Sequence, residues 1–260
     1  MTQTRTPPAA DFDGRKRYGV DQQVEQKLTD LFAQHEIDPL EAINHFPLFA
    51  RRVHLKKFLA HWELFRQTIE LPGDIVELGV FRGLSLLTFA NFLEVASIGD
   101  RTKRVFGFDN FTGFGDLTPE DGPDYDQSHK REGGFSPAAY QQQLREIIGI
   151  FDLDRFVPWK DRIDLVVGDI EQTVPQFVRD HPGLRISLLH FDCDMYRPTR
   201  AGLECLFPLV VRGGLVIFDE YGILEWSGES KAVDEYLADT DYVLKKFPWQ
   251  GAPGAYLVKQ

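Results

Sequence analysis

Two acidic segments of the sequence are the most informative about chemistry. Residues 190–196 (HFDCDMY) and residues 218–221 (FDEY) each contain the end of a short apolar run typical of a buried strand. If the two strands are neighbours in one sheet, Asp192, Asp219 and Glu220 converge at its edge, where carboxylates need a cation or a proton to share a small volume. All-oxygen ligands favour Mg²⁺ over zinc. The segments therefore predict a magnesium site, with helix capping by some of these carboxylates as the alternative.

A turn between an apolar run and a helical stretch indicates a second binding element. Residues 77–85 (ELGVFRGLS) contain Gly79 and Gly83, which allow the backbone to pass close to a ligand and to begin a helix. Their spacing is G-x-x-x-G, so the G-x-G-x-x-G fingerprint of dinucleotide sites is absent. The turn predicts a ligand contact, with glycine required for packing alone as the alternative.

Two further runs end in carboxylates. Asp109 follows the second apolar run and can accept both hydroxyls of a ribose, with capping of a turn as the alternative. Asp169 and Ile170 follow the third run, where the carboxylate could accept an exocyclic amine while the apolar side chain covers a purine face. Together with the glycine turn, these residues predict a site for adenosine that does not require phosphate groups on the ligand.

The chain after Gly73 supplies the elements that would bring these residues together. Short apolar runs alternate five times with helical stretches, which predicts an α/β fold with a parallel sheet and helices on both faces. Two final strand-like runs, 242–249 and 254–260, predict a closing antiparallel hairpin. We therefore expect a doubly wound, seven-stranded, mostly parallel sheet that binds ligands at the carboxyl ends of its strands. The five parallel runs are residues 74–80, 104–111, 162–169, 186–192 and 213–220.

The first part of the chain predicts a different organisation. Residues 1–17 have little to bury and indicate a mobile arm. Residues 18–72 predict a helical extension with an apolar stripe at helical spacing, suited to a lid or to subunit contacts and therefore to a homo-oligomer. Residues 73–260 form the expected strand-helix domain. The stripe comprises Val53, Leu55, Phe58, Leu59, Trp62, Phe65 and Ile69.

Composition excludes several classes of protein. The 260 residues carry 40 acidic and 29 basic side chains, a formal net charge of -11 that disfavours binding to nucleic acid. No long apolar span predicts a membrane helix. The two cysteines, Cys193 and Cys205, cannot form a disulfide framework. These features predict a cytoplasmic protein without nucleic-acid or membrane partners.

A long polar segment, residues 112–136, separates the second apolar run from the next helical stretch. Long loops in compact domains are usually functional or disordered. We expect a lid over the ligands, in which Lys130 and Arg131 contact an anion and Gly133 with Gly134 serves as a hinge. A solvated charged loop is the alternative.

Several segments resemble the macrocin O-methyltransferase (TylF/MycF) family. Members are class I S-adenosylmethionine-dependent enzymes that methylate sugar hydroxyls during natural-product biosynthesis. The resemblance covers about residues 45–240 and implies S-adenosylmethionine and Mg²⁺ as cofactors, which would make residues 73–260 a methyltransferase domain. The matching segments are VELGVFRGLS, FGFDNFTGFGD, VVGDIEQT, LLHFDCDMYRPTRAGLECLFPLVVRGGLVIFDEY and ESKAVDEY.

The resemblance also implies roles for single residues. Glu77, Gly79 and Gly83 would lie near the methionine part of the cofactor, Asp109 at the ribose and Asp169 at the adenine. Asp192, Asp219 and Glu220 would hold the metal, although the family pattern has two successive aspartates where this chain has Asp219 and Glu220. Further cofactor contacts are expected from Phe81, Arg82, Ser85, Phe111 and Ile170. The acceptor is expected to contact Lys130, Arg131, Tyr196 and Tyr221.

The expected reaction is transfer of the sulfonium methyl group to a sugar hydroxyl. Mg²⁺ bound to two vicinal hydroxyls would orient the acceptor and lower its pKa. A carboxylate would take the proton, with Asp192 the first candidate base, Asp194 the second and His190 the competing group. The expected acceptor is a nucleotide-linked 6-deoxyhexose such as a dTDP-rhamnose type, methylated at the 3-hydroxyl, or a sugar already attached to a natural product.

Three other functions remain open from the sequence. A catechol-like phenol would serve the same metal chemistry as a sugar diol. An NAD-dependent sugar oxidoreductase is disfavoured because the chain lacks G-x-G-x-x-G. A non-catalytic nucleoside-binding module would not need the two acidic strand ends.

Overall fold

The computed structural model describes residues 18–123 and 130–260. The expected mobile arm, residues 1–17, and residues 124–129 of the expected lid lie outside the described residues. The chain separates into two compact units, and the boundary falls between Lys56 and Lys57. The boundary expected between residues 72 and 73 from sequence remains a prediction, as does a role of the helical extension in lid or subunit contacts.

Helices make up the described part of the first unit. Asp38 caps one of them by accepting hydrogen bonds from the backbone N–H groups of Leu40 (2.8 Å) and Glu41 (3.2 Å). Arg51 forms ion pairs with Asp21 and Glu25 and so ties the segment before α4 to α1. The helices are α1 (Tyr18–Gln34), α2 (Pro39–Asn44), α3 (Phe46–Phe49) and α4 (Arg52–Phe65), the last of which continues into the second unit.

A twisted sheet forms the centre of the second unit. Its strand order is β3-β2-β1-β4-β5-β6, with every neighbouring pair parallel except β5 and β6. The order reverses between β1 and β4, so the sheet is doubly wound as expected, with the ligand-binding crevice at that reversal. The strands are β1 (Asp74–Leu78), β2 (Val105–Asp109), β3 (Ile163–Val167), β4 (Ile186–Phe191), β5 (Val210–Phe218) and β6 (Ala255–Val258).

The prediction of a seventh strand is wrong. In the described ranges, residues 242–249 pair with the sheet only through an isolated antiparallel bridge, in which Lys245 and Tyr256 exchange two hydrogen bonds of 2.8 Å. Pro248 has no N–H to donate, and the Phe247 ring stacks on both Trp249 and Tyr256. The segment therefore uses its side chains for packing and does not extend the ladder.

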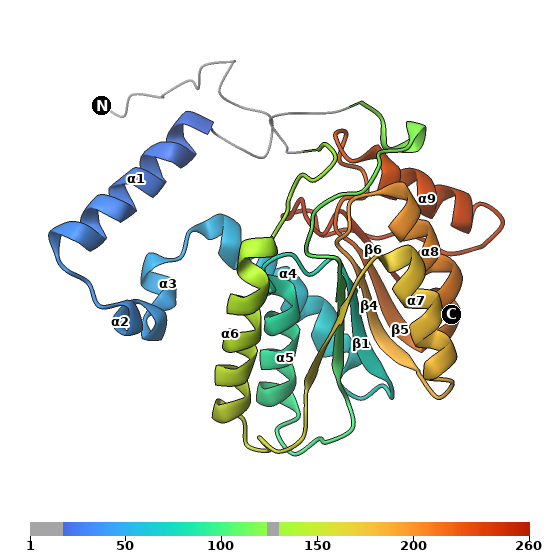
Figure 1. Cartoon of the computed structure of the whole chain (residues 1–260), viewed down its shortest axis with the longest axis horizontal. Helices are drawn as coiled ribbons and strands as arrows, with labels where there is room; N and C mark the ends of the chain where they lie inside the picture. Colours follow the sequence, from blue (N-terminus) through green and yellow to red (C-terminus); the bar gives the residue numbers. More distant parts are fainter. Residues whose placement is uncertain (1–17, 124–129) are drawn as a thin grey trace. The chain divides into compact units, whose positions relative to one another are not determined.

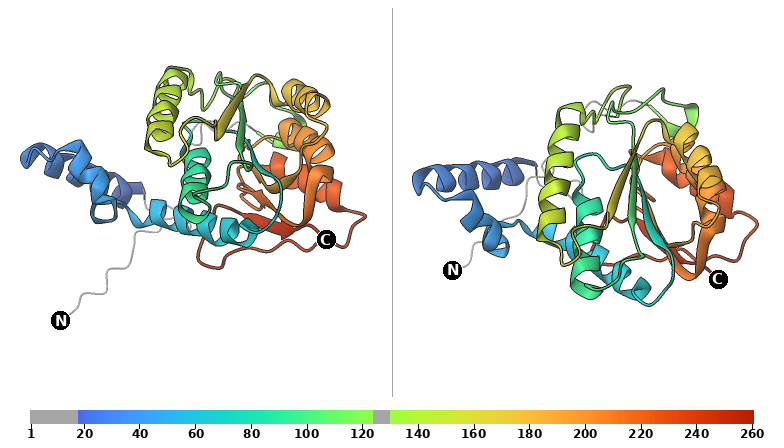
Figure 2. Two further views of the ribbon diagram at one scale, coloured as in Figure 1. Left: turned by 90° about the horizontal axis from the view of Figure 1, so that it is seen from below. Right: turned by 60° about the horizontal axis from the view of Figure 1, so that its bottom comes forward.

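Helices cover both faces of the sheet (Figures 1 and 2). Alternation along each strand separates two apolar cores, because Ile75 packs against α5 and the end of α4 whereas Val76 packs toward α7 and α8. The helices of the first face are α5 (Leu84–Ala96) and α6 (Gln141–Asp154), together with the second-unit part of α4. Those of the other face are α7 (Ile170–Asp180), α8 (Tyr196–Leu206) and α9 (Ser227–Leu237).

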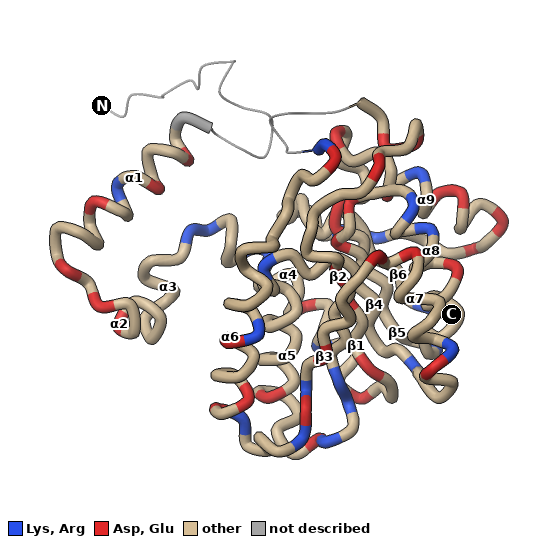
Figure 3. The backbone as a smooth tube through the Cα atoms, in the orientation of Figure 1, with Lys and Arg blue, Asp and Glu red and all other residues tan. Residues whose placement is uncertain are grey.

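No helix within residues 18–123 and 130–260 is long and apolar enough to cross a membrane. Figure 3 shows Lys and Arg scattered among Asp and Glu in the view drawn. The net charge is thus spread over many elements, and the acidic strand ends are one part of it.

Candidate functional site

A cavity of about 850 Å³ opens at the carboxyl ends of the strands. It lies at the point where the strand order reverses, which is where doubly wound sheets bind their ligands. Its walls include the turn after β1, the ends of β2, β4 and β5, and the N-terminus of α7. The cavity therefore gathers the segments that the sequence singled out.

The glycine turn after β1 brings two strand ends into contact. Gly79 has φ +90°, and a Cβ atom added there would lie 1.9 Å from the carbonyl oxygen of Asp192. The Asp192 N–H in turn donates to the Leu78 carbonyl over 2.8 Å. Only glycine allows this approach, so the turn places the first strand end directly against the residue expected to act at the metal.

Asp109 holds the same turn from the end of β2. Its carboxylate accepts hydrogen bonds from the N–H groups of Val80 (2.8 Å), Phe81 (2.7 Å) and Phe111 (2.7 Å). Phe81, at φ +51°, lies in a backbone region that non-glycine residues rarely adopt, and these bonds stabilise it there. A carboxylate has about four acceptor positions, so Asp109 retains about one for a ligand. The expected capture of both ribose hydroxyls needs two.

The end of β3 also faces the cavity. Asp169 caps α7 by accepting from the Glu171 N–H over 2.9 Å, and Ile170 lies beside it on the cavity wall. Among the other expected cofactor contacts, Arg82 and Ser85 line the cavity, whereas Gly83 and Phe111 do not. The guanidinium of Arg82 lies 3.7 Å from the centre of the Tyr140 ring.

The three expected metal ligands come together. Asp192, Asp219 and Glu220 each place one carboxylate oxygen within 4.8 Å of the others. Asp219 Oδ1 and Glu220 Oε2 are buried and have no hydrogen-bond partner among the described residues. Buried carboxylate oxygens without donors are costly, so the cluster is suited to a bound cation.

A lysine that sequence reasoning missed already contacts two of these carboxylates. Lys57 Nζ, from α4, lies 2.8 Å from Asp219 Oδ2 and 3.2 Å from Asp192 Oδ2. Nothing local in the sequence distinguishes Lys57 from its neighbour Lys56. Its helical spacing within the apolar stripe is the only signal that it faces the core.

Burial and charge set the ionisation of this group. Burial alone would raise the pKa of Asp219, but Lys57 and His190 outweigh it and hold that pKa below its usual range. Burial and the charge of Asp219 raise the pKa of Asp192 to about 6, against the opposing effect of Lys57. Burial would lower the pKa of Lys57, yet Asp192, Asp219 and Glu220 raise it well above its ordinary value. These three carboxylates therefore favour the charged form of Lys57.

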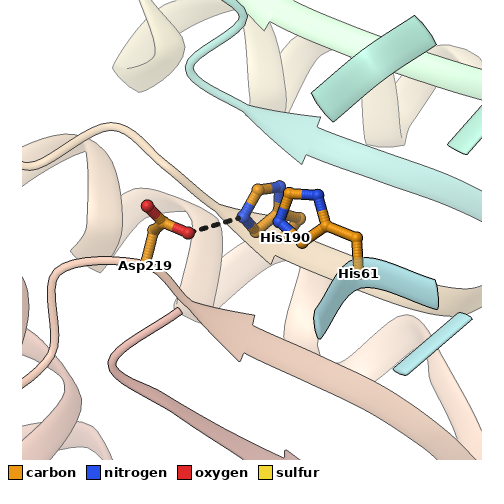
Figure 4. A group of neighbouring side chains, drawn as sticks. All are labelled: His61, His190 and Asp219. Atoms are coloured by element: carbon orange, nitrogen blue, oxygen red, sulfur yellow. Dashed lines mark ion pairs between the residues drawn. The ribbon is translucent and has the colours of Figure 1, made fainter. Parts of the chain in front are cut away.

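His190 lies behind the cluster and is not accessible to the cavity. Its Nδ1 is 3.0 Å from Glu77 Oε1 and its Nε2 is 3.6 Å from Asp219 Oδ1. Burial, which lowers the pKa of His190, is outweighed by the two carboxylates, which raise it to about 10. Figure 4 shows Asp219 and His190 facing each other with the ring of His61 beside them. Asp192 and Asp194 line the cavity and His190 does not, so the carboxylates are better placed to act as the expected base; the Glu77 side chain is likewise fully buried.

Two further carboxyl groups adjoin the metal cluster. Asp194 lines the cavity, and burial, followed by the charges of Asp192 and Asp219, raises its pKa well above the usual value. Glu229, which sequence reasoning missed, is fully buried on α9 and accepts from the Glu220 N–H over 2.9 Å. Glu229 therefore positions the backbone at the metal cluster.

The structure does not bring the expected acceptor contacts to the cavity. Lys130 is 1% exposed and donates to the carbonyl oxygens of Asp121 and Glu225, so it ties the lid segment to the loop before α9. Tyr196 bonds to Glu235 (2.6 Å) and Tyr221 to Asp234 (2.7 Å), both outside the cavity. Arg131 does not line it either.

Aromatic side chains form the wall where those contacts were expected. Trp226 packs against Phe114 and Phe135, with ring centres 5.6 Å and 6.2 Å apart, and Phe135 packs edge-on against Phe81. All four residues line the cavity. This wall is apolar, and the acidic residues Asp192, Asp219 and Glu220 line the same cavity.

Comparison with known proteins identifies relatives over much of the chain. The sequence model described as Macrocin-O-methyltransferase (TylF) matches residues 18–245. Demethyldecarbamoylnovobiocin O-methyltransferase of Streptomyces niveus is 31% identical over 188 residues, 69% of this chain and 66% of that protein. Mycinamicin III 3''-O-methyltransferase of Micromonospora griseorubida is 28% identical and covers 59% of this chain and 57% of that protein. The chain thus matches between about half and two thirds of the length of these relatives.

Solved structures extend the similarity over nearly the full chain. The crystal structure of CalS11, a calicheamicin methyltransferase, has a TM-score of 0.85, 34% identity and 92% coverage of both chains. An apo structure of CalS11, titled TDP-rhamnose 3'-O-methyltransferase, has a TM-score of 0.76 and covers 92% of this chain and 94% of that chain. The doubly wound sheet is therefore that of class I methyltransferases. With a family match of this extent and a strand-end cavity that unites the acidic segments, the chain belongs to the macrocin O-methyltransferase family.

Proposed function

We propose that the protein transfers a methyl group from S-adenosylmethionine to a sugar hydroxyl during antibiotic biosynthesis. One observation carries the proposal: a single cavity joins a glycine turn suited to the cofactor with a cluster of carboxylates suited to an acceptor diol. The names of the relatives support it, because each is called an O-methyltransferase and one is titled a TDP-rhamnose 3'-O-methyltransferase. The preferred acceptor is a dTDP-linked 6-deoxyhexose of the rhamnose type, methylated at the 3-hydroxyl.

The cofactor would occupy the side of the cavity beside β1 to β3. Backbone groups of the turn at Gly79 approach the methionine part, and Asp109 offers its remaining acceptor position to one ribose hydroxyl. Asp169 and Ile170 line the cavity and would flank the adenine. The apolar wall that includes Phe81 excludes water from the methyl group, whose in-line transfer needs positioning more than covalent catalysis.

Asp192, Asp219 and Glu220 fit a magnesium ion. Their donor set is all oxygen, and two of the buried oxygens lack a donor among the described residues. When bound, Mg²⁺ would hold vicinal hydroxyls and increase the acidity of the acceptor. Glu220 reaches one methylene further than an aspartate, and the hydrogen bond from its N–H to Glu229 fixes the backbone from which it reaches.

Asp192 is the proposed base. Its side chain is 22% exposed and lines the cavity, whereas His190 is fully enclosed. Asp194, also at the cavity, is the second candidate. Trp226 would cover the apolar face of the sugar, and Arg197, a solvent-exposed cation on the cavity wall, would contact the diphosphate in place of Lys130.

The proposal is tested by methyl transfer from labelled S-adenosylmethionine. Acceptors would include dTDP-rhamnose, a neutral rhamnoside and a catechol, each with added Mg²⁺ or with EDTA. We expect transfer to dTDP-rhamnose at the 3-hydroxyl, loss of activity with EDTA, and at least a hundredfold lower kcat for Asp219→Asn. Transfer only to the catechol would refute the sugar acceptor, and full activity in EDTA would refute the metal.

A further inference from the structure

The cation that contacts the acidic cluster in this structure belongs to the protein. Lys57 Nζ donates to one oxygen of Asp219 and one of Asp192, and its side chain is 25% exposed. His61 follows one helical turn later on α4 and lies beside His190 (Figure 4). Residues four apart share a helix face, so one face of α4 presents both Lys57 and His61 to the Asp219 carboxylate.

A metal ion bound to the same oxygens would meet this ammonium group. Mg²⁺ binds carboxylate oxygens at about 2.1 Å, and Lys57 Nζ lies 2.8 Å from Asp219 Oδ2. A magnesium ion on that oxygen would therefore be no more than about 4.9 Å from Nζ, the sum of the two bond lengths. Two cations so close in a partly buried site repel each other, so each weakens the binding of the other.

Lys57 alone does not satisfy the hydrogen-bonding capacity or the charge of the three carboxylates. Its ammonium leaves Asp219 Oδ1 and Glu220 Oε2 without donors among the described residues. It also carries a single charge against three carboxylates. Lys57 therefore stabilises the carboxylates only in part, and the remaining negative charge still attracts a second cation.

We propose that Lys57 is a tethered counter-cation that competes with the divalent metal for Asp192 and Asp219. Resting on the metal site of the proposed function, this assignment makes Lys57 a positioning residue that holds the carboxylates before the metal binds and retracts when it does. It follows that Lys57 weakens metal affinity and stabilises the metal-free protein.

The test measures metal binding without cofactor or acceptor. Mn²⁺, titrated into the demetallated full chain, is followed by the electron paramagnetic resonance of the free ion. We expect Lys57→Met to lower the Kd for Mn²⁺ at least tenfold, or about 1.4 kcal/mol. Lys57→Arg, which keeps the charge, should bind within threefold of the parent, and Asp219→Asn should abolish binding in either background.

Lys56→Met is the matched control. It removes one positive charge from the same helix, and Lys56 forms no ion pair with these carboxylates in the part of the chain that the structure describes. We expect its Kd to stay within twofold of the parent. Melting temperatures give a second readout, because Lys57→Met should lower the Tm without metal and regain the parental Tm with saturating Mg²⁺.

Several results would overturn the inference. An unchanged or higher Kd in Lys57→Met refutes competition, as does an equal gain in Lys56→Met. Loss of binding in His61→Gln would place the metal among the imidazoles instead. Absence of Mn²⁺ binding in both the parent and Lys57→Met also refutes it, whereas failure of the methyltransferase proposal would appear separately, in the transfer assay.

Discussion

Gly79→Ala tests whether the contact between the ends of β1 and β4 builds the site. The new Cβ would lie 1.9 Å from the Asp192 carbonyl oxygen and 2.5 Å from its carbonyl carbon, both backbone atoms that cannot rotate away. The residue also has φ +90°, which costs a non-glycine residue about 1–2 kcal/mol. Overpacking adds about 1–3 kcal/mol, so we expect the free energy of unfolding to fall by about 2–5 kcal/mol.

Two other glycines calibrate this magnitude. An alanine Cβ at Gly83, φ +85°, would meet Leu144 Cδ1 at 2.4 Å, but this is the end of a side chain that can move. We expect a smaller loss of about 1–3 kcal/mol. Gly99 has no neighbouring atom within 4 Å of its added Cβ and is not held at positive φ, so Gly99→Ala should change stability by no more than about 0.5 kcal/mol.

Urea denaturation measures the stability of the three glycine variants, and calorimetry measures their affinity for S-adenosylmethionine. Separation of the two strand ends in Gly79→Ala should weaken cofactor binding at least about tenfold, or 1.4 kcal/mol. The thermal midpoint should fall by about 5–15 °C. A Gly79→Ala protein with parental stability and cofactor affinity, or a loss in Gly99→Ala equal to that in Gly79→Ala, would show that the close approach does not limit either property.

The remaining predictions concern the acceptor side of the cavity. Lys130→Met should lower the free energy of unfolding by about 2 kcal/mol, because the buried Asp121 carbonyl and the part-buried Glu225 carbonyl lose their donor; urea denaturation measures this, and an unchanged midpoint would show that these two bonds do not stabilise the fold. Trp226→Ala should raise the acceptor KM at least about tenfold while the Kd for S-adenosylmethionine changes less than threefold, since Trp226 forms the aromatic wall with Phe135. Arg197→Ala should raise the KM for dTDP-rhamnose about tenfold and leave the KM for a neutral rhamnoside unchanged, so equal effects on both acceptors would exclude a diphosphate contact.

Much of the fold was predictable because its signals are local. Each parallel strand is a short apolar run that ends at, or is followed by, glycine or an acidic residue, and this pattern depends only on neighbouring residues. The closing hairpin was harder to predict from the sequence. Residues 242–249 have the composition of a strand, but the absent N–H of Pro248 and the packing of the Phe247 ring limit pairing to one bridge at Lys245. Whether such a segment joins a sheet depends on its neighbours in space.

The convergence of the carboxylates was predictable from the sequence, but the contacts of long side chains were not. Asp192, Asp219 and Glu220 converge because parallel strands end at one edge of a sheet, which the strand pattern already implies. The contacts expected from Lys130 and Tyr196 were not realised, because residue type does not specify the direction of a long side chain. Each found a nearer partner, a buried carbonyl group in one case and Glu235 in the other.

By itself, the sequence determined the parallel sheet, the glycine turn and the edge at which the carboxylates gather, since all three follow from periodicity and backbone freedom. Tertiary structure decided which groups surround those carboxylates. Lys57 is 162 positions from Asp219, and His190 is 113 positions from Glu77. Contacts over such separations depend on how a helix packs on the sheet and on which strands become neighbours, and these are properties of the folded chain. These contacts place the Lys57 ammonium group against the acidic strand ends and the buried His190–Glu77 pair behind them.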